Sequence, residues 1–261
     1  MKPVRPKKAL GQHFLKDLSI AKAIADTVDR FPGLPVLEVG PGMGVLTQFL
    51  VPKQRELKVV EIDDESVTWL RNHYPELENS IVEDDFLKMH LDHLFEGRPF
   101  VLTGNYPYNI SSQIFFKMLD NRDRIPGCTG MIQREVAQRL AAAPGSKAYG
   151  VLSIFVQAWY DVDYLFTVDE NVFNPPPKVK SAVISMRRND VTSLGCDEAL
   201  FRRIVKTVFT MRRKTLRNGM KSIIGSDCAL LADPLFNRRP EQLSVAEFVQ
   251  LTNDVESYVV K

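Results

Sequence analysis

The chain has 261 residues, of which 44% are hydrophobic and 25% charged, and a formal net charge of +2, so it has room for one large domain and a smaller one. No apolar run approaches the ~20 residues that span a membrane, and the first residues lack the apolar stretch of a signal peptide, so we expect no membrane association. Three widely separated cysteines, Cys128, Cys196 and Cys228, match neither a metal site nor a disulfide framework; we therefore expect no bound metal and a cytoplasmic location.

The chain opens with a basic arm, residues 1–16, which carries five Lys or Arg and no acid. The end of this arm, Leu10–Leu15, is expected to fold over a ligand as a lid. Residues 17–30 then predict an amphipathic helix that ends at a Pro-Gly pair.

Short β-rich runs next alternate with helical segments. The expected strands are 36–39, 57–62, 80–83, 100–103 and 129–133, and the expected helices between them are 44–51, 64–74 and 110–120. This alternation predicts an α/β fold with a parallel, doubly wound, Rossmann-like sheet, because parallel strands need crossover helices. Ligands of such sheets bind at the carboxyl ends of the strands.

After residue 150 the pattern changes. Residues 160–168 and 181–188 predict two strands joined by a proline-rich loop, an antiparallel hairpin at the sheet edge. Three helices are expected beyond them, at 197–210, 212–223 and 244–256. We therefore place one boundary near residue 190, between a ligand-binding catalytic domain (1–190) and a small helical domain (191–261).

Basic side chains are concentrated in a second segment, residues 187–221, with ten Lys or Arg against three acids. Their local positive field can attract a phosphate backbone although the net charge is small. Arg212, Arg213 and Lys214 stand together at an expected helix start. These three and Arg217 are the predicted contacts to nucleic acid.

A glycine-rich turn follows the first expected strand. Gly40, Gly42 and Gly44 occupy alternate positions, which permits positive φ and close approach of a ligand. A dinucleotide-binding turn needs a glycine where Val45 stands. Glu38, two residues before the first glycine, would repel a pyrophosphate but suits a cationic sulfonium or ammonium. The turn therefore favours S-adenosylmethionine over NAD.

Acidic residues end the next two strands. A carboxylate after the second strand can accept hydrogen bonds from a ribose diol, and Glu61 fits this role best, with Asp63 as the alternative. After the third strand, Asp85 is the predicted acceptor for the adenine amine of the cofactor.

The fourth strand runs into Asn105-Tyr106-Pro107-Tyr108. An exocyclic adenine amine is a poor nucleophile because its lone pair is delocalised into the ring. Two acceptors, the Asn105 side-chain carbonyl and the Tyr106 backbone carbonyl, would hold its N–H groups and localise that lone pair. Pro107 fixes φ and offers no competing N–H, and Tyr108 offers a ring for stacking.

An aromatic residue heads the proline-rich loop of the expected hairpin. Phe173 is predicted to stack on the target base opposite Tyr108, after the base has left its own stack. The chemistry needs no strong general base before attack, because the methyl group already sits on a cationic sulfur. Positioning and exclusion of water then supply the rate.

These residues together resemble the ribosomal RNA adenine dimethyltransferases, and most closely their bacterial small-subunit type. The likeness covers nearly the whole chain. Its most specific segments are Asn105–Ser111, Ser146–Gly150 and the Phe173-x-Pro-Pro-Pro-Lys loop. The resemblance implies a class I S-adenosylmethionine-dependent methyltransferase fold with a helical, RNA-binding C-terminal domain.

The resemblance also implies a substrate: two adjacent adenosines in the 3′-terminal hairpin loop of small-subunit (16S) rRNA. Each would become N6,N6-dimethyladenosine on a late assembly intermediate of the subunit, with S-adenosylhomocysteine as the other product. By motif position the implied cofactor contacts are His13, Leu15, Gly40, Glu61, Asp85 and Asn105. A monomer is expected. Two departures are His13, where the family often has Asn, and Tyr106, where it often has Leu or Ile.

Three other functions stay open at this point. A large-subunit rRNA dimethyltransferase shares the fold, although the glycine turn and the proline-rich loop favour the small-subunit type. A DNA adenine methyltransferase usually carries Asp in place of Asn105. An assembly factor that binds rRNA, with methylation as a secondary role, is compatible with the enzyme.

Overall fold

The computed structural model describes residues 4, 6–7 and 10–260 of the chain. Three residues of the basic arm, Lys2, Arg5 and Lys8, lie outside the described residues. The chain divides into two compact units, and each is continuous in space but not in sequence. The first comprises Met1–Ala137 and Asp161–Arg188, and the second comprises Gln138–Tyr160 and Asn189–Lys261.

The first unit is built on a seven-stranded sheet with the order β4-β3-β2-β5-β6-β9-β7. Its strands are β2 (Val36–Val39), β3 (Leu57–Glu61), β4 (Ile81–Glu83), β5 (Val101–Thr103), β6 (Gly127–Gln133), β7 (Tyr160–Val168) and β9 (Ser181–Arg188). The pairs from β4 to β6 are parallel, and β9 joins β6 antiparallel. The predicted doubly wound α/β sheet with an antiparallel edge is confirmed.

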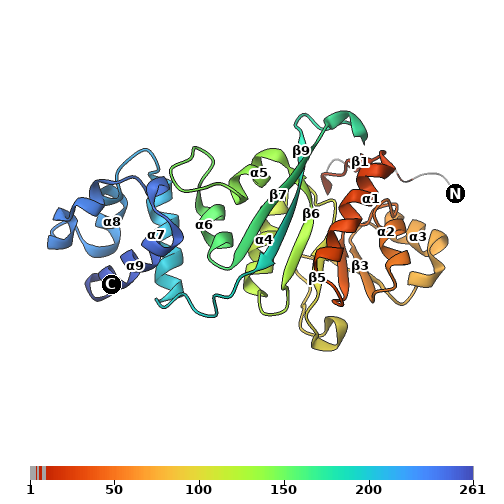
Figure 1. Ribbon diagram of the computed structural model, residues 1–261, viewed down its shortest axis with the longest axis horizontal. Coiled ribbons are helices and arrows are strands. Elements are labelled where there is room, and N and C mark those ends of the chain that lie inside the picture. The colour runs from red at the N-terminus through yellow and green to blue at the C-terminus, as the bar shows by residue number, and fades with distance from the viewer. Residues whose placement is uncertain (1–3, 5, 8–9, 261) are drawn as a thin grey trace. The chain divides into compact units, whose positions relative to one another are not determined.

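Three helices connect parallel strands: α2 (Thr47–Leu50) lies between β2 and β3, α3 (Asp64–His73) between β3 and β4, and α4 (Ser111–Asp120) between β5 and β6. In addition, α1 (Leu18–Asp26) precedes β2, and α5 (Arg134–Leu140) follows β6. The Asp17 side chain begins α1 by accepting the backbone N–H groups of Ser19 and Ile20, which have no partner inside the helix. Figure 1 shows α1 lying across the sheet, where it contacts β6.

Burial on both faces explains why the central strands have little polar alternation. All four residues of β2 and all three of β5 are buried. One apolar cluster joins α1 to the strands β2 and β3 through Ala25, Val36 and Val59. This packing fixes the strand ends that carry the polar residues.

A second, two-stranded sheet ties the N-terminal segment to the proline-rich loop. Its strands are β1 (Phe14–Leu15) and β8 (Phe173–Asn174), which pair antiparallel with Leu15 opposite Phe173. The backbone N–H of Lys16 extends the pairing by donating to the carbonyl of Val172 at 2.7 Å.

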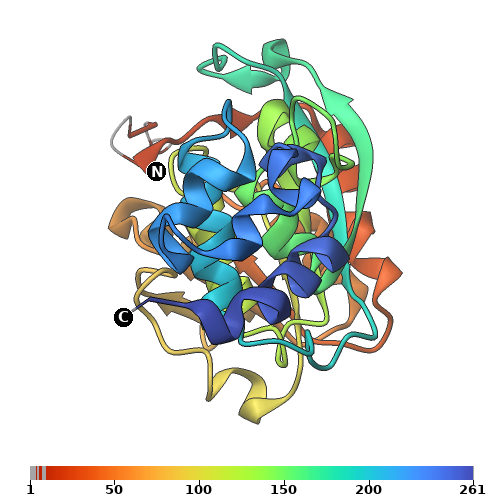
Figure 2. The same ribbon diagram turned by 90° about the vertical axis from the view of Figure 1, so that its left-hand side faces the viewer.

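The second unit is helical. It contains α6 (Val151–Gln157), α7 (Glu198–Thr210), α8 (Leu216–Ile224) and α9 (Val245–Val255). The blue helices α7, α8 and α9 pack together in Figures 1 and 2. Ring contacts join Phe155 of α6 to Phe201 of α7 at 6.1 Å between centroids. None of the helices in the described part of the chain combines the length and apolar character needed to cross a membrane.

Two sequence expectations differ from the structure. The division at Arg188 lies close to the expected boundary near residue 190, but Gln138–Tyr160 also belongs to the second unit because α6 packs against α7. The helix expected at 212–223 begins at Leu216, since Thr215 is extended and acts as its N-cap. Arg212, Arg213 and Lys214 therefore lie in the turn before α8, not in the helix.

Candidate active site

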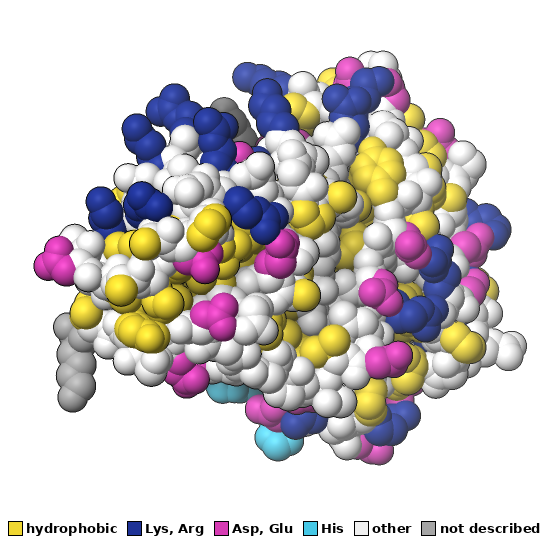
Figure 3. Space-filling view, turned by 60° about the vertical axis from the view of Figure 1, so that its left-hand side comes forward, with side chains coloured by type: hydrophobic (Ala, Val, Ile, Leu, Met, Phe, Trp, Pro, Cys, Tyr) yellow, Lys and Arg dark blue, Asp and Glu magenta, His cyan; other side chains and the backbone are white. Residues whose placement is uncertain are grey.

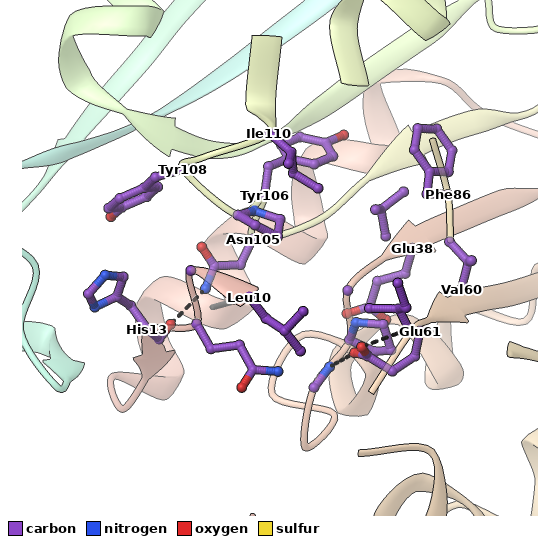
Figure 4. Close-up of a pocket in the computed structure, with 18 of the residues that line it drawn as sticks. Leu10, His13, Glu38, Val60, Glu61, Phe86, Asn105, Tyr106, Tyr108 and Ile110 are labelled. Atoms are coloured by element: carbon purple, nitrogen blue, oxygen red, sulfur yellow. Dashed lines mark hydrogen bonds between the residues drawn. The ribbon is translucent and has the colours of Figure 1, made fainter. Parts of the chain in front are cut away.

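A cavity of about 290 Å³ lies at the carboxyl ends of β2, β3, β4 and β5, where parallel sheets bind their ligands. Six segments line it: residues 10–15, 38–42, 45–46, 60–62, 84–87 and 105–110. Figure 4 shows Tyr108, His13 and Asn105 toward one end, and Glu61, Val60 and Phe86 toward the other. The cavity therefore has two chemically different ends.

Most predicted site residues meet in this cavity. Those that line it are His13, Leu15, Glu38, Gly40, Gly42, Glu61, Asp85, Asn105, Tyr106, Pro107 and Tyr108. Two predicted residues, Gly44 and Phe173, do not line it. The contacts of each residue decide what it can do.

Glu38 is a buried acid beneath the glycine turn. It is 1% exposed, and its Oε2 accepts a hydrogen bond from the Thr47 hydroxyl at 2.7 Å. Burial raises the pKa of Glu38 to about 8, against the opposing effect of the Thr47 hydrogen bond. No cation among the described residues pairs with Glu38, and a buried carboxyl of this kind fits a site for a cationic ligand.

The glycines of the turn have different roles. Gly40 and Gly42 adopt φ of +67° and +56°, which other residues rarely do, and both line the cavity. Gly44 has φ of +81°, and a Cβ there would collide with the ring of Tyr74, whose hydroxyl donates to the Gly44 carbonyl at 3.0 Å. Gly44 therefore has a packing role and does not line the cavity, and its role as a cofactor contact stays a prediction.

Glu61 is held by backbone donors at the end of β3. Its Oε2 accepts from the N–H of Gly42 at 3.0 Å, and its Oε1 accepts from the N–H groups of Ile62 and Asp63 at 2.9 and 3.0 Å. Burial raises the pKa of Glu61, and these three hydrogen bonds oppose that rise. A carboxylate has about four acceptor positions, so one remains for a ligand hydroxyl in the cavity.

Asp63, the alternative to Glu61, forms its hydrogen bonds with other side chains of the protein. It is 3% exposed and bonds the side chains of Lys7, Gln12 and Ser66. It is absent from the cavity lining. The geometry therefore favours Glu61 for a ribose.

Asp85 lines the cavity with a half-buried carboxylate. Its Oδ1 accepts from the Leu87 N–H at 2.9 Å, and its Oδ2 lies 3.4 Å from the Lys88 ammonium. Phe86 beside it is 4% exposed and forms part of the cavity wall. An acceptor next to an apolar ring suits the amine and face of an adenine.

Asn105 is oriented by the N-terminal segment. Its amide nitrogen donates to the backbone carbonyl of His13 at 3.2 Å, as the dashed line in Figure 4 marks. This hydrogen bond fixes which end of the amide faces the segment. The amide oxygen on the other side is left as the acceptor that the predicted chemistry requires.

Tyr106 anchors the loop after β5. Its ring is 1% exposed, and its hydroxyl donates to the Thr129 carbonyl at 2.8 Å. Its backbone N–H donates to the Met131 carbonyl at 3.0 Å. A Cβ on Gly130 would collide with both this ring and the Gly104 carbonyl, so glycine at 130 makes the space for Tyr106. The side chain is thus buried, and only the backbone of Tyr106 is available to a substrate.

Tyr108 and His13 form an aromatic pair at the other end of the cavity. Their ring centroids lie 5.4 Å apart at 28°, and the Tyr108 hydroxyl bonds the Ser181 hydroxyl. The His13 Nδ1 donates to the Pro175 carbonyl at 2.9 Å, because that oxygen can only accept. Both rings are therefore fixed next to Asn105.

Phe173 does not reach the cavity. Its side chain is 1% exposed and packs in a core cluster with Leu15, Ile24 and Val183. The β1–β8 pairing turns this residue inward, opposite Leu15. The prediction that Phe173 stacks on a base does not fit the structure, and His13 occupies the position beside Tyr108 instead.

Leu10, Gln12 and Phe14 line the cavity and belong to the segment expected as a lid. The predictions missed Val60 and Ile62, which flank Glu61 in the lining. Ile62 is 53% exposed, which is unusual for a large apolar side chain. A large apolar residue directly after the acid at a strand end was the signal that could have identified it.

The basic residues of the second unit fall into two classes. Arg212 donates to the carbonyls of Ser146 and Lys147 at 3.3 and 2.7 Å, and Arg217 donates to Asn237 at 3.0 Å. Arg213 and Lys214 are exposed. In the space-filling view of Figure 3, many Lys and Arg side chains (dark blue) gather along one border of the face shown. Arg213 and Lys214 are thus the better candidates for phosphate contact.

Comparison with known proteins identifies the family. The family model described as "Ribosomal RNA adenine dimethylase" matches residues 4–255. The chain belongs to this family. The predicted enzyme class and its cofactor, S-adenosylmethionine, are thereby confirmed, as is binding of rRNA.

The curated relatives match along nearly their full length. "Ribosomal RNA small subunit methyltransferase A" of Bacteroides thetaiotaomicron is 72% identical over 256 residues, covering 98% of this chain and 96% of the relative. The protein of the same name in Flavobacterium johnsoniae is 54% identical, with 98% of both chains covered.

Solved structures show the same fold. A dimethyladenosine transferase from Plasmodium falciparum has a TM-score of 0.77 at 25% identity, covering 94% of this chain and 98% of its own. The 23S rRNA methyltransferase ErmE has a TM-score of 0.66 at 25% identity, covering 92% and 99%. The class I methyltransferase fold is confirmed.

Proposed function

We propose that this enzyme transfers methyl groups from S-adenosylmethionine to N6 of two adjacent adenosines in the 3′-terminal hairpin loop of small-subunit rRNA. The products are N6,N6-dimethyladenosines. The observation that carries the proposal is the orientation of the Asn105 amide. Its nitrogen donates to the His13 carbonyl, so its oxygen is left to accept an amine N–H of the target adenine.

The Glu61 end of the cavity holds the cofactor in this proposal. Glu61 accepts a ribose hydroxyl, Asp85 accepts the adenine amine, and Phe86 contacts the ring. Glu38 lies below the glycine turn, and a cation bound there would lower its pKa and favour its charged form. The bound cofactor supplies a methyl group on positively charged sulfur.

The Tyr108 end receives the target adenine. Tyr108 stacks on the base, and the Asn105 oxygen and the Tyr106 carbonyl accept the two amine N–H groups. These hydrogen bonds draw the nitrogen toward a tetrahedral geometry and direct its lone pair at the methyl group. The protein's contribution is positioning in a largely apolar cavity that excludes water.

The small-subunit substrate is favoured over the large-subunit one by similarity. The relatives named for the small subunit are 54–72% identical, whereas ErmE, named for 23S rRNA, is 25% identical. The test is incubation of unmethylated small and large subunits with labelled cofactor, followed by mapping of modified adenosines. We expect dimethyladenosine at the 3′-terminal hairpin of the small subunit; label confined to the large subunit would reject the assignment.

Asn105→Ala provides the test of mechanism. Removal of the acceptor should lower the single-turnover rate by about a hundredfold, the usual effect of losing one positioned hydrogen-bonding group in an active site. Binding of S-adenosylhomocysteine to this variant, followed by calorimetry, should change far less. An unchanged transfer rate would contradict the proposed role.

The cellular setting is part of the proposal. The enzyme acts in the cytoplasm, as a monomer, on a late assembly intermediate of the small subunit. Three free cysteines, one of them buried, suit a reducing compartment. If Asn105→Ala cells mature their subunits normally, rRNA binding is the part of the function that assembly needs.

A further inference from the structure

Lys7 and residues 10–15 form a strap beside the candidate cofactor site, and residues 10–15 line its cavity. At its C-terminal end the strap is fixed by the β1–β8 pairing and by the Asn105 hydrogen bond to the His13 carbonyl. At its N-terminal end Lys7 bonds Asp63, which follows β3.

Strand order determines where the strap must pass. Asn105 follows β5 and Asp63 follows β3, and β2 lies between these two strands. The strap therefore runs over the end of β2, above the glycine turn. The Phe14 ring confirms this path, because it lies 3.3 Å from the position of a Cβ on Gly42.

The N-terminal attachment is a small network centred on one buried carboxylate. Asp63 is 3% exposed and accepts from Lys7, from the Ser66 hydroxyl at 2.9 Å and from the Gln12 amide at 3.4 Å. The Lys7 ammonium also lies 3.1 Å from Glu65. Two residues of the strap, Lys7 and Gln12, thus converge on Asp63.

The residues of the strap are also hydrogen-bonded to one another. The Lys7 backbone N–H donates to the Gln12 side chain at 2.8 Å, and the Leu10 N–H donates to the Lys7 carbonyl at 3.0 Å. Burial raises the pKa of Asp63, but hydrogen bonds from Lys7, Ser66 and Gln12 outweigh it and hold the pKa below its ordinary value. The carboxylate is charged at neutral pH and keeps its hold on Lys7.

We propose that Lys7 and Asp63 form a latch that holds the strap closed over the bound cofactor and so sets the rate at which cofactor leaves. This inference rests on the proposed cofactor site. It gives Lys7 of the basic arm a role in holding the cofactor. Asp63 is a positioning residue, since it acts through the strap and does not line the cavity.

The test measures dissociation of S-adenosylhomocysteine from the full chain by stopped flow. Trp69 is a suitable reporter because its indole N–H donates to the Met43 carbonyl in the glycine turn at 3.2 Å. The variants are Lys7→Met, Asp63→Asn and the double variant. The control is Lys22→Met, which breaks the exposed ion pair with Asp26 on α1.

Each single latch variant should raise the off-rate about tenfold, the scale of a lost hydrogen bond to a charged group. The double variant should add little, since both changes open the same latch. Lys22→Met should leave the off-rate unchanged. In steady-state methyl transfer the latch variants should raise the KM for S-adenosylmethionine more than they lower kcat, because the latch contributes to holding the cofactor.

Three results would overturn the latch. One is an unchanged off-rate in both single variants, with thermal unfolding showing that they are folded. Another is a double variant whose effect is the product of the single effects. The third is Lys7→Met weakening RNA binding while leaving the off-rate alone. Failure of wild-type protein to bind S-adenosylhomocysteine, or binding insensitive to Glu61→Gln, would instead reject the cofactor site itself.

Discussion

At the scale of single residues, the site is formed by polar groups whose other partners are already fixed by the fold. Three backbone N–H groups hold Glu61, and the strap carbonyl holds the Asn105 amide nitrogen. Each functional atom is thus the one left over when internal hydrogen bonds are satisfied. Preorganisation of this kind reduces what a ligand must rearrange on binding.

Glu38 gives a pH-dependent prediction. Its folded-state pKa of about 8 exceeds the ordinary value of 4.5, so between these values the folded state retains a proton that the unfolded chain has lost. Stability contributed by this group therefore falls as pH rises from about 5 to 8. Glu38→Gln removes the titration and still accepts from Thr47.

Urea unfolding of both proteins across this range measures the effect. The unfolding free energy of Glu38→Gln, relative to wild type, should increase from pH 5 to pH 8 by more than 1 kcal/mol, since one pKa unit corresponds to about 1.4 kcal/mol. A difference that stays constant with pH would show that Glu38 has no raised pKa.

Tyr106 gives a prediction about loop position. Tyr106→Phe keeps the ring and removes only the hydroxyl that donates to the Thr129 carbonyl. The free energy of unfolding should fall by about 1–2 kcal/mol because this buried hydrogen bond is lost. The transfer rate should fall several-fold while cofactor affinity stays the same, because only the substrate-side carbonyl shifts. The control is Tyr164→Phe, whose hydroxyl bonds Thr167 on the surface. Equal effects of the two variants on rate would argue against an anchor.

At the scale of elements, the parallel sheet and the order of acids at its strand ends followed from the sequence. Short apolar β-rich runs that alternate with amphipathic helical segments are compatible with few topologies other than a parallel sheet. Glu38, Glu61 and Asp85 could therefore be placed at one edge of that sheet. Phe173 could not be placed, because its orientation depends on the antiparallel pairing of β1 with β8, two residues each, from segments about 160 residues apart. Short non-local pairings leave no periodic signal.

The same reasoning explains Gly44. Its place in a glycine-rich turn indicated a ligand contact, but its partner, Tyr74, lies 30 residues away along the chain. The phosphate contact predicted for Arg212 stays a prediction, and its charge is visible in the sequence, whereas the two carbonyls that it binds are not.

A pair of glycine variants tests the role of Gly44. Gly44→Ala has to adopt positive φ and also displace the Tyr74 ring, whereas Gly33→Ala, at φ of +76°, has open space around it. Gly33→Ala should lower the free energy of unfolding by about 1 kcal/mol through backbone strain alone. Gly44→Ala should lower it by about 1–3 kcal/mol more, because the added methyl group overpacks against Tyr74.

Thermal unfolding compares the two variants, and calorimetry compares their affinity for S-adenosylhomocysteine. The folded Gly44→Ala protein should bind with near wild-type affinity if Gly44 serves packing. Similar stability of the two variants combined with a loss of affinity in Gly44→Ala would restore the original interpretation as a ligand contact.

At the scale of the whole molecule, local clusters of positive charge matter more for RNA binding than the small net charge. We predict that the exposed Arg213 and Lys214 contact the RNA phosphates. Replacement of both by Ala should weaken binding of a small-subunit hairpin RNA and reduce the slope of log affinity against log salt by about 1.4, or ~0.7 for each lost phosphate contact to single-stranded RNA. Fluorescence anisotropy at several salt concentrations measures the slope.

A matched double variant removes the same total charge elsewhere. Lys22→Ala with Arg71→Ala deletes two cations that are paired with acids on α1 and beside α3. Its salt slope should equal that of wild type. Identical slopes for both double variants would mean that net charge, not a defined surface, attracts the RNA.

The interleaved composition of the two units limits how this protein can be divided. The backbone passes between them three times, after Ala137, Tyr160 and Arg188. A fragment that stops at residue 190 would retain α6 but lose α7, which leaves the Phe155 ring without its neighbour. No single cleavage yields two intact pieces, so the catalytic and helical units have to be synthesised, inherited and degraded as one.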